Sequence, residues 1–135
     1  MQVNVSARAS MAAVATAAAT AVLAPTYAFA GGGENLEEGT CTGTAVWKLK
    51  AAEALNNQVG VEFEVDVNRR GQQWQVALFH NNTRVLNKTL TTRGVSGSFE
   101  ARALEANRAG DDRFRARAVR VSDGQSCVGR VLFDR

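Results

Sequence analysis

Hydrophobic and polar residues alternate with a period of two over most of the chain beyond residue 40. The clearest stretch is QVGVEFEVDV, in which Val61, Phe63 and Val65 fall on one side and Glu62 and Glu64 on the other. Successive side chains of a β-strand point to opposite faces, so this alternation predicts a strand with one buried and one solvated face. No convincing helical period of about 3.6 residues accompanies it.

The same alternation recurs in further segments that are separated by turn-forming residues. Strands are expected in TAVWKLKA, QWQVALF, TRVLNKT, SFEARAL, DRFRARAV and CVGRVLF. Asn81-Asn82 predicts a tight hairpin, because asparagine tolerates the positive φ that such a turn requires. Val119 and Val121 fall out of phase with Phe114, which predicts a β-bulge near Ala118. Seven to eight short strands at this spacing predict an all-β antiparallel sandwich or barrel.

The first 30 residues have the order of a secretory signal. Arg8 precedes an apolar run over residues 11–24, and the small-residue site Ala28-Phe29-Ala30 follows it. This pattern predicts a signal peptide over residues 1–30, cleaved after Ala30, and therefore a secreted protein. The run is shorter than the roughly 20 residues that span a bilayer, so no stable membrane insertion is expected after cleavage.

The remaining chain divides into a short leader and one domain. Residues 31–40, GGGENLEEGT, are rich in glycine and glutamate and have little to bury, so they predict a flexible leader. Residues 41–135 are expected to form the β-sandwich domain, whose length suffices for one small core.

The chain has two cysteines, Cys41 and Cys127. Disulfides form in exported proteins, so export makes one bridge between them the expected state. Two reactive thiols are the alternative, and it is disfavoured because neither cysteine has a nearby histidine or a C-x-x-C partner. The bridge would close nearly the whole domain and join its first strand to its last.

Trp74 and the run AGDDRFRARA resemble the immunoglobulin-like sandwich. In this resemblance Trp74 takes the place of the strand-C tryptophan, and Phe114 and Ala116 take those of the usual tyrosine and second cysteine. The resemblance implies an immunoglobulin-like antiparallel β-sandwich without the usual bridge between its sheets. The runs FEVDVNRRGQQWQV, SGSFEARAL and NRAGDDRFRARA also resemble small secreted single-domain proteins of actinobacteria. That likeness implies export and a β fold, and it carries no activity.

Arginine occupies every second position of DRFRARAV, which makes this strand the main candidate for binding. A contiguous surface of one charge sign attracts ligands of the other sign. Such a strip could hold an anionic cell-wall polymer, a sulfated glycan or an acidic protein face. The candidate binding residues are Arg113, Arg115, Arg117, Arg130 on the last strand, and Gln73 and Gln75 on the tryptophan strand. The alternative is an ordinary solvated strand face whose long side chains cover apolar surface.

Charge and motifs exclude several other classes. The formal net charge is +3 and falls to +2 on loss of Arg8, which is below what nucleic-acid binders carry. No aromatic platform lies among the outward arginines, so no nucleic-acid partner is expected. Nucleophile-elbow and zinc-protease motifs are missing from the sequence, so no enzyme and no cofactor is predicted. His80 is the only histidine, and Asp111 and Asp112 are expected to be turn formers, so no metal site is predicted.

Two hypotheses about function follow from the sequence. The first is a secreted, non-catalytic binding module for an extracellular or cell-wall partner of unknown identity. The second is a secreted inhibitor of an extracellular hydrolase, acting through an exposed loop such as Asn68 to Gln72 or Val95 to Ser98. The lack of a second disulfide that would stiffen either loop counts against the inhibitor.

Overall fold

A computed structural model describes residues 29–134 of the chain, with side chains from residue 33 onward. The predicted signal peptide lies almost entirely outside the described residues, so the signal, its cleavage after Ala30 and secretion stay predictions. Within the described part there is no helix of the length and apolarity needed to cross a membrane.

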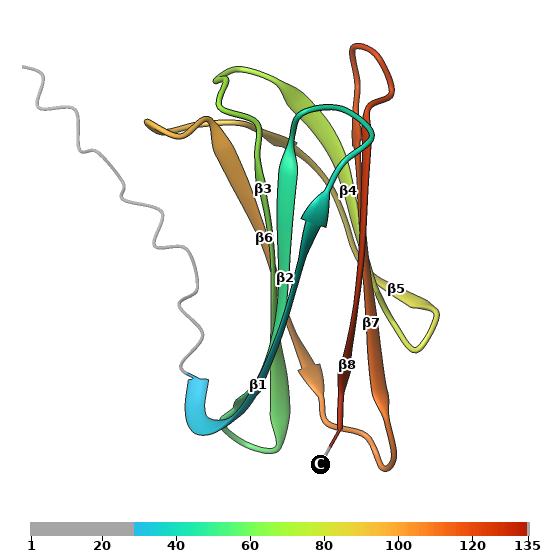
Figure 1. Ribbon diagram of the computed structural model, residues 1–135. Coiled ribbons are helices and arrows are strands. Elements are labelled where there is room, and N and C mark those ends of the chain that lie inside the picture. Colours follow the sequence, from blue (N-terminus) through green and yellow to red (C-terminus); the bar gives the residue numbers. More distant parts are fainter. Residues whose placement is uncertain (1–28, 135) are drawn as a thin grey trace, which may run out of the picture.

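Eight antiparallel strands form two four-stranded sheets that face each other (Figure 1). The first sheet has the order β1 (Phe29–Thr40), β2 (Val46–Ala54), β3 (Gln58–Asp66) and β6 (Ser98–Ala106). The second sheet has the order β5 (Thr83–Thr91), β4 (Gln73–His80), β7 (Asp112–Arg120) and β8 (Ser126–Phe133). The predicted all-β sandwich of seven to eight strands is confirmed.

The core lies between the sheets and is built from the residues that the alternation assigned to it. Trp74 of β4 is fully buried and packs across the sandwich against Phe99 of β6, with 6.0 Å between ring centroids. Phe63 of β3 is also fully buried and contacts the half-buried Trp47 of β2. Aromatic side chains therefore fill the space between the two layers.

Residues 31–40 correct the prediction of a flexible leader. They belong to β1, which pairs with β2 from Glu34 opposite Ala52 to Thr40 opposite Val46. Backbone hydrogen bonds to the open edge of β2 hold β1, and they need no apolar side chains. The glycine- and glutamate-rich sequence therefore gives no sign of this strand.

The predicted β-bulge near Ala118 is wrong. The pairing of β7 with β4 runs without interruption from Phe114 opposite His80 to Arg120 opposite Trp74. Val119 stays on the outer face, and Val121 beyond the strand is 55% exposed. The irregularity lies instead between β4 and β5, where the register shifts after Leu78.

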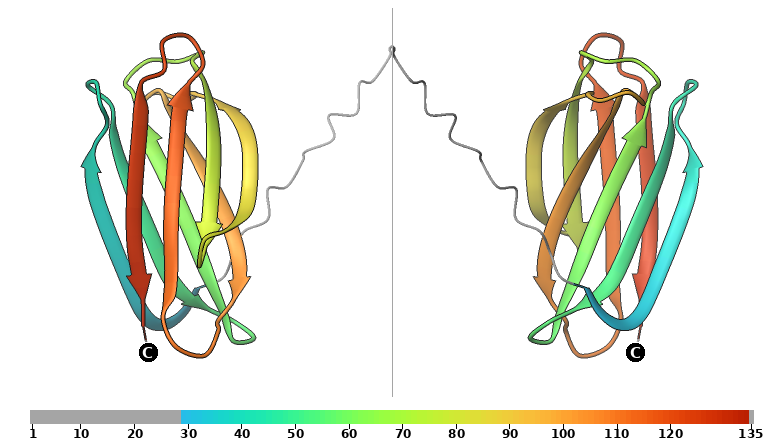
Figure 2. Two further views of the ribbon diagram at one scale, coloured as in Figure 1. Left: turned by 90° about the vertical axis from the view of Figure 1, so that its right-hand side faces the viewer. Right: turned by 90° about the vertical axis from the view of Figure 1, so that its left-hand side faces the viewer.

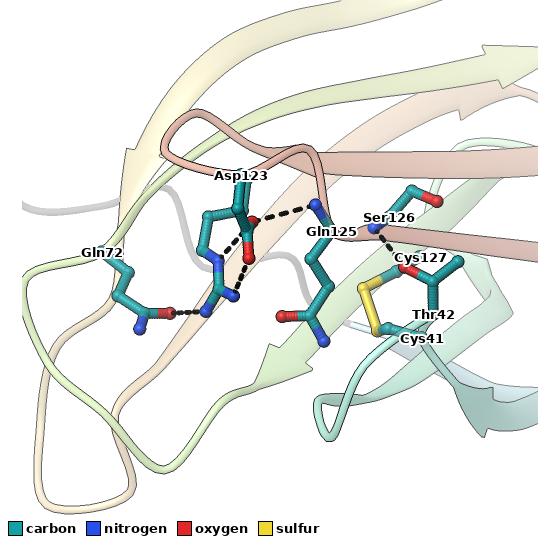
Figure 3. Close-up of a disulfide and its surroundings, with 8 residues drawn as sticks. Cys41, Thr42, Gln72, Asp123, Gln125, Ser126 and Cys127 are labelled. Carbon is teal, nitrogen blue, oxygen red and sulfur yellow. Dashed lines mark hydrogen bonds and ion pairs between the residues drawn. A yellow bond between two sulfur atoms is a disulfide. The ribbon is translucent and has the colours of Figure 1, made fainter.

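The predicted disulfide is confirmed. Cys41, directly after β1, is bonded to Cys127 in β8 across 86 residues of sequence, and the bridge joins the two sheets (Figure 3). We call this end of the sandwich the disulfide end; its turns are residues 41–45, 67–72, 92–97 and 121–125. The turns at 55–57, 81–82 and 107–111 lie at the opposite end, where β8 ends (Figures 1 and 2).

Candidate binding face

Strand β7 presents its arginines on the outer face of the second sheet, as the alternation predicted. Phe114, Ala116 and Ala118 are buried, whereas Arg113 and Arg117, which alternate with them, are exposed. The left view of Figure 2 looks onto this sheet, with β7 and β8 in orange and red.

The register extends the arginines into a row across all four strands. Arg115 lies opposite Arg130 of β8 on one side and opposite Phe79 of β4 on the other. Phe79 in turn lies opposite Arg84 of β5. The guanidinium carbon of Arg115 lies 4.2 Å from the centre of the Phe79 ring, a cation–π contact that covers the ring.

We call Arg84, Arg113, Arg115, Arg117 and Arg130 the basic face. Arg84 was not among the predicted binding residues, although the sequence carries a signal for its position. Asn81 and Asn82 have φ of 45° and 66° and form the predicted two-residue turn, which pairs His80 with Thr83. Counting back from that pair would have placed Arg84 beside Phe79.

Gln73 and Gln75 lie on this outer face but not among the arginines. Gln75 is opposite Val119, and the Gln73 carbonyl accepts a hydrogen bond from the Val121 amide at 2.9 Å. Because β4 and β7 run antiparallel, the start of β4 meets the end of β7. The two glutamines therefore lie toward the disulfide end of the face.

The positive charges of the basic face are hardly compensated. Arg113 reaches Asp111 at 3.6 Å, and both side chains are at least half exposed, so this pair contributes little. Arg84, Arg117 and Arg130 have no acidic partner within ion-pair distance among the described residues. Arg115 and Arg130 are like charges in directly opposed positions, an arrangement that destabilises a sheet.

The outer face of the first sheet provides an internal comparison. Its cations Lys48, Lys50 and Arg102 all lie beside carboxylates. Lys48 pairs with Glu38 at 3.5 Å, Lys50 with Glu62 at 2.9 Å, and Arg102 with Glu62 and Glu100. The chain thus compensates its cations on one face and leaves them uncompensated on the other.

A hollow of about 500 Å³ lies at one margin of the basic face, beside β1 and β8. It is lined by Arg113, Arg115 and Arg130 together with Glu37, Asn82, Phe114, Val131 and Leu132. The lining carries three guanidinium groups and one carboxylate, that of Glu37, so its net charge is positive and favours an anionic group. A partly recessed charge pair is screened less by salt than a fully exposed one.

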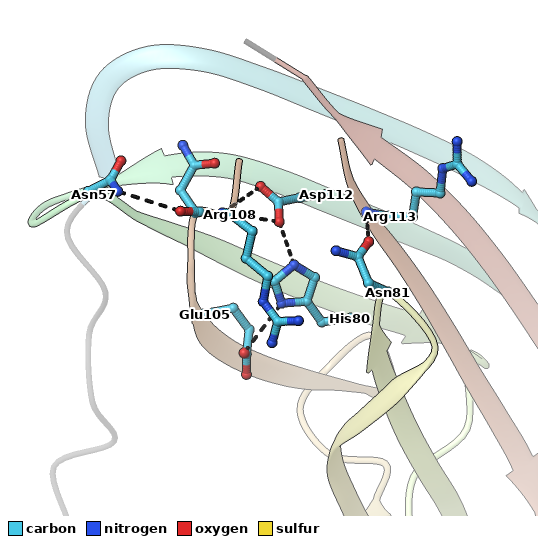
Figure 4. A network of polar contacts seen from close by, with 8 residues as sticks. Asn57, His80, Asn81, Glu105, Arg108, Asp112 and Arg113 are labelled. Carbon is cyan, nitrogen blue, oxygen red and sulfur yellow. Dashed lines mark hydrogen bonds and ion pairs between the residues drawn. The ribbon is translucent and has the colours of Figure 1, made fainter. Parts of the chain in front are cut away.

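His80 lies at the end away from the disulfide and forms a buried network (Figure 4). Its Nε2 lies 2.5 Å from Oδ1 of Asp112, its Nδ1 lies 3.4 Å from Oε2 of Glu105, and its ring stacks on Phe114. Both His80 and Asp112 are fully buried. Each ring nitrogen faces a carboxylate, so the imidazole is held between two acidic side chains.

This network corrects the prediction that Asp112 is merely a turn former. Its carboxylate binds the imidazole and also accepts hydrogen bonds from the Arg108 amide at 3.3 and 3.4 Å. The network ties β4, β6 and β7 together. Among residues 29–134, no group of three or more histidine, cysteine or acidic side chains is arranged to hold a metal ion.

No protein-family model, curated protein or solved structure matches the chain. The function therefore has to be inferred from the geometry and charge of the faces and turns described above.

Proposed function

We propose that the protein is a secreted, non-catalytic binding module that holds an anionic extracellular or cell-wall polymer on the basic face. One observation carries this proposal: Arg84, Arg117 and Arg130 have no acidic partner among the described residues, whereas the cations of the opposite face are all paired. A polyanion would supply the missing counter-charges. It would also relieve the repulsion between Arg115 and Arg130.

The geometry of the strands favours a linear polymer. Alternate residues of a strand are spaced by about 6.6–6.8 Å, and neighbouring strands by about 4.8 Å. A chain lying along β7 would meet Arg113, Arg115 and Arg117 in succession, with Arg130 beside the central one. Nucleic acid fits less well, because Arg115 covers one face of the Phe79 ring and leaves less aromatic surface for stacking bases.

Secretion is part of the proposal and has two supports. Residues 1–30 carry the pattern of a signal peptide. The Cys41–Cys127 disulfide is of a kind that persists in oxidising compartments.

The test is salt elution from an immobilised sulfated polysaccharide, with the oxidised protein and a variant in which Arg113, Arg115 and Arg117 become alanine. We expect the wild-type protein to be retained and to elute at higher salt than the variant. Each phosphate or sulfate contact releases counterions, so retention should fall steeply with salt concentration.

The matched control removes the same number of positive charges from the other face, through Lys48→Ala, Lys50→Ala and Arg102→Ala. This variant has the net charge of the arginine variant but an intact basic face, so we expect it to be retained more strongly. Equal loss of retention in both variants would mean that net charge alone governs binding, and the proposal would be wrong.

The inhibitor remains a second candidate because one loop is held firmly without a second disulfide. Val95 is 96% exposed at the tip of the turn between β5 and β6. Thr92 beneath it is buried, donates through Oγ1 to the Arg69 carbonyl at 2.6 Å and accepts from the Gln72 amide at 2.9 Å. The Gly97 carbonyl further accepts from the Val67 amide at 3.1 Å, so the two turns brace each other.

Inhibition assays separate this candidate from the first. An inhibitor acting through this loop would lower the activity of at least one extracellular hydrolase in a panel, and Val95→Asp would abolish the effect. The arginine variant would inhibit as wild type does. No inhibition by the wild-type protein at micromolar concentrations would remove this candidate and leave the binding module untouched.

A further inference from the structure

Two adjoining hollows at the disulfide end form a polar depression, which we call the turn pocket. They have volumes of about 570 and 450 Å³ and share Thr44 and Arg120. The first is also lined by Val46, Asp66, Val67, Asn68, Arg69 and Gln72, and the second by Thr42, Gly43, Asp123, Gly124 and Gln125. Both volumes lie in the range of small-molecule sites.

Arg120 is fixed at the junction of the two hollows. Its Nε donates to Oδ1 of Asp123 at 2.8 Å, and one terminal nitrogen donates to Oε1 of Gln72 at 3.0 Å. The other terminal nitrogen also binds Asp123. The guanidinium carbon lies 5.7 Å from the centre of the Trp74 ring. Such a side chain is already oriented, so a ligand would not have to order it.

The charges of the turn pocket cancel. The side-chain hydrogen bond from Arg120 lowers the pKa of Asp123 to about 2, so this carboxylate is ionised at neutral pH. Arg69 and Asp66 add one further charge of each sign to the lining. The turn pocket is therefore not a second anion site, in contrast to the basic face.

Gln125 is a buried amide in the lining that lacks a partner. Its side chain is 8% exposed, and its Nε2 makes no hydrogen bond with any described residue. Figure 3 shows this side chain between the Asp123 turn and the disulfide. Gly43 packs directly on the amide, since a Cβ at residue 43 would lie 2.2 Å from Nε2. Buried amides almost always have a hydrogen-bond partner, so this one indicates an acceptor that the described residues do not supply.

We propose that the turn pocket binds a neutral saccharide unit of an extracellular glycan. A sugar hydroxyl both donates and accepts, and it carries no charge. The lining offers donors and acceptors side by side: the Gln125 amide, the Thr44 hydroxyl, the Asn68 amide and the Arg120–Asp123 pair. This site is independent of the basic face, which lies on the outer surface of the second sheet.

The test is a titration of the ¹⁵N-labelled, oxidised protein with glucose, galactose, mannose and N-acetylglucosamine, and with their common disaccharides, into the tens of millimolar. We expect at least one of them to shift the backbone amides of Gly43, Asn68, Gly124 and Gln125 in a saturable way. The amides of β7 at Arg113 to Arg117 should not move. Because the ligand is neutral, added sodium chloride should leave the affinity unchanged.

Two variants and one matched control define the site. Gln125→Leu removes the buried amide, and Thr44→Val removes a hydroxyl with little change in shape; each should weaken binding roughly five- to tenfold. Gln58→Leu makes the same chemical change at the opposite end of the sandwich and should bind as wild type does. If Gln125→Leu alters the fold, Thr44→Val still tests whether the turn pocket binds the saccharide.

Three results would overturn the proposal. The first is the absence of any saturable shift with every neutral saccharide. The second is binding that added sodium chloride abolishes. The third is unchanged affinity in Thr44→Val and Gln125→Leu. None of these results bears on the basic face, so failure here is distinguishable from failure of the proposed function.

Discussion

Asp111 and Asp112 are neighbours of identical chemistry with opposite surroundings. Asp112 is fully buried against His80, whereas the side chain of Asp111 is half exposed and only reaches Arg113. Removing one partner of a buried hydrogen bond costs much, because the other is left buried without a partner.

We predict that Asp112→Ala lowers the free energy of unfolding by about 2–3 kcal/mol, since His80 and the Arg108 amide lose their acceptor. Asp111→Ala is the matched control and should stay within about 0.5 kcal/mol of wild type. Urea denaturation followed by tryptophan fluorescence measures both. Equal, small effects of the two substitutions would show that the network does not stabilise the fold.

Asp111 and Asp112 also show how much of the site could be predicted from the sequence at the residue scale. Alternation correctly assigned Arg113, Arg115 and Arg117 to an outer face, because the side-chain period of a strand is local information. Asp112 lies on the same side of β7 as Phe114 and Ala116, so the alternation also carries a signal for its burial, whereas Asp111 lies before the strand. Its partner His80 belongs to another strand, and the alternation of β7 holds no information about that pairing.

Asp123 leads to a prediction about pH. Hydrogen bonds from the Arg120 side chain and from the backbone N–H of Gln125 stabilise its ionised form and lower its pKa from 3.8 to about 2. A carboxylate whose pKa is lower in the folded state stabilises the fold above its ordinary pKa, and that contribution is lost as the pH falls. We expect the loss between about pH 4 and pH 2.

Carbon-13 NMR of the Asp123 carboxyl group from pH 6 to pH 1.5 measures the titration directly. The Arg120 side-chain signals should follow the same curve, and in Asp123→Asn they should show no step in this range. A midpoint for Asp123 at its ordinary value would contradict the prediction.

At the scale of elements, Trp47 of β2 connects the edge strands of both sheets. Its ring packs over Gly39 of β1 and Gly129 of β8, where an added Cβ would lie 2.6 and 2.7 Å from ring carbons. Both contacts are closer than side chains tolerate, so these two positions require glycine for close approach.

We predict that Gly129→Ala lowers the free energy of unfolding by about 1–3 kcal/mol, because Trp47 must shift in a packed layer. Gly33→Ala is the control, since a Cβ there would meet nothing within 4 Å. Thermal unfolding of the two variants against wild type measures the difference. Destabilisation by Gly33→Ala as large as that by Gly129→Ala would contradict the steric argument.

The strands differ in how well the sequence predicts them. Those with an apolar inner face, such as β3 and β4, are visible as alternation. β1 is not, because backbone pairing with β2 and the Glu38–Lys48 contact hold it, and neither requires apolar residues. Val119 and Val121 led to the wrong prediction of a bulge. Valine on an outer face is common, and it does not imply a bulge.

At the scale of the whole molecule, the two outer faces of the sandwich have different electrostatic character. The net charge predicts only a mildly basic protein. The separation of compensated from uncompensated cations depends on register, which places Arg130 beside Arg115 and Glu62 beside both Lys50 and Arg102. The turn pocket could not be predicted from the sequence either, because three turns that are distant in the sequence build it.

The disulfide contributes a large share of the free energy of unfolding of the domain. It joins Cys41 to Cys127 across 86 residues, and Thr42 and Ser126 beside it exchange two further hydrogen bonds between the sheets. In the chain-entropy account, closing so long a loop restricts the unfolded chain by roughly 4–5 kcal/mol, and measured bridges often contribute less. A domain of this size is stable by only about 5–10 kcal/mol.

We therefore predict that replacing both cysteines by alanine lowers the free energy of unfolding by about 3–4 kcal/mol and leaves the domain marginally folded. Urea unfolding of the double variant, and of wild type with and without reductant, should give matching losses. The double variant is the control for side effects of the reductant. Unchanged stability after reduction, or two thiols that react in the native state of the oxidised protein, would refute this role for the bridge.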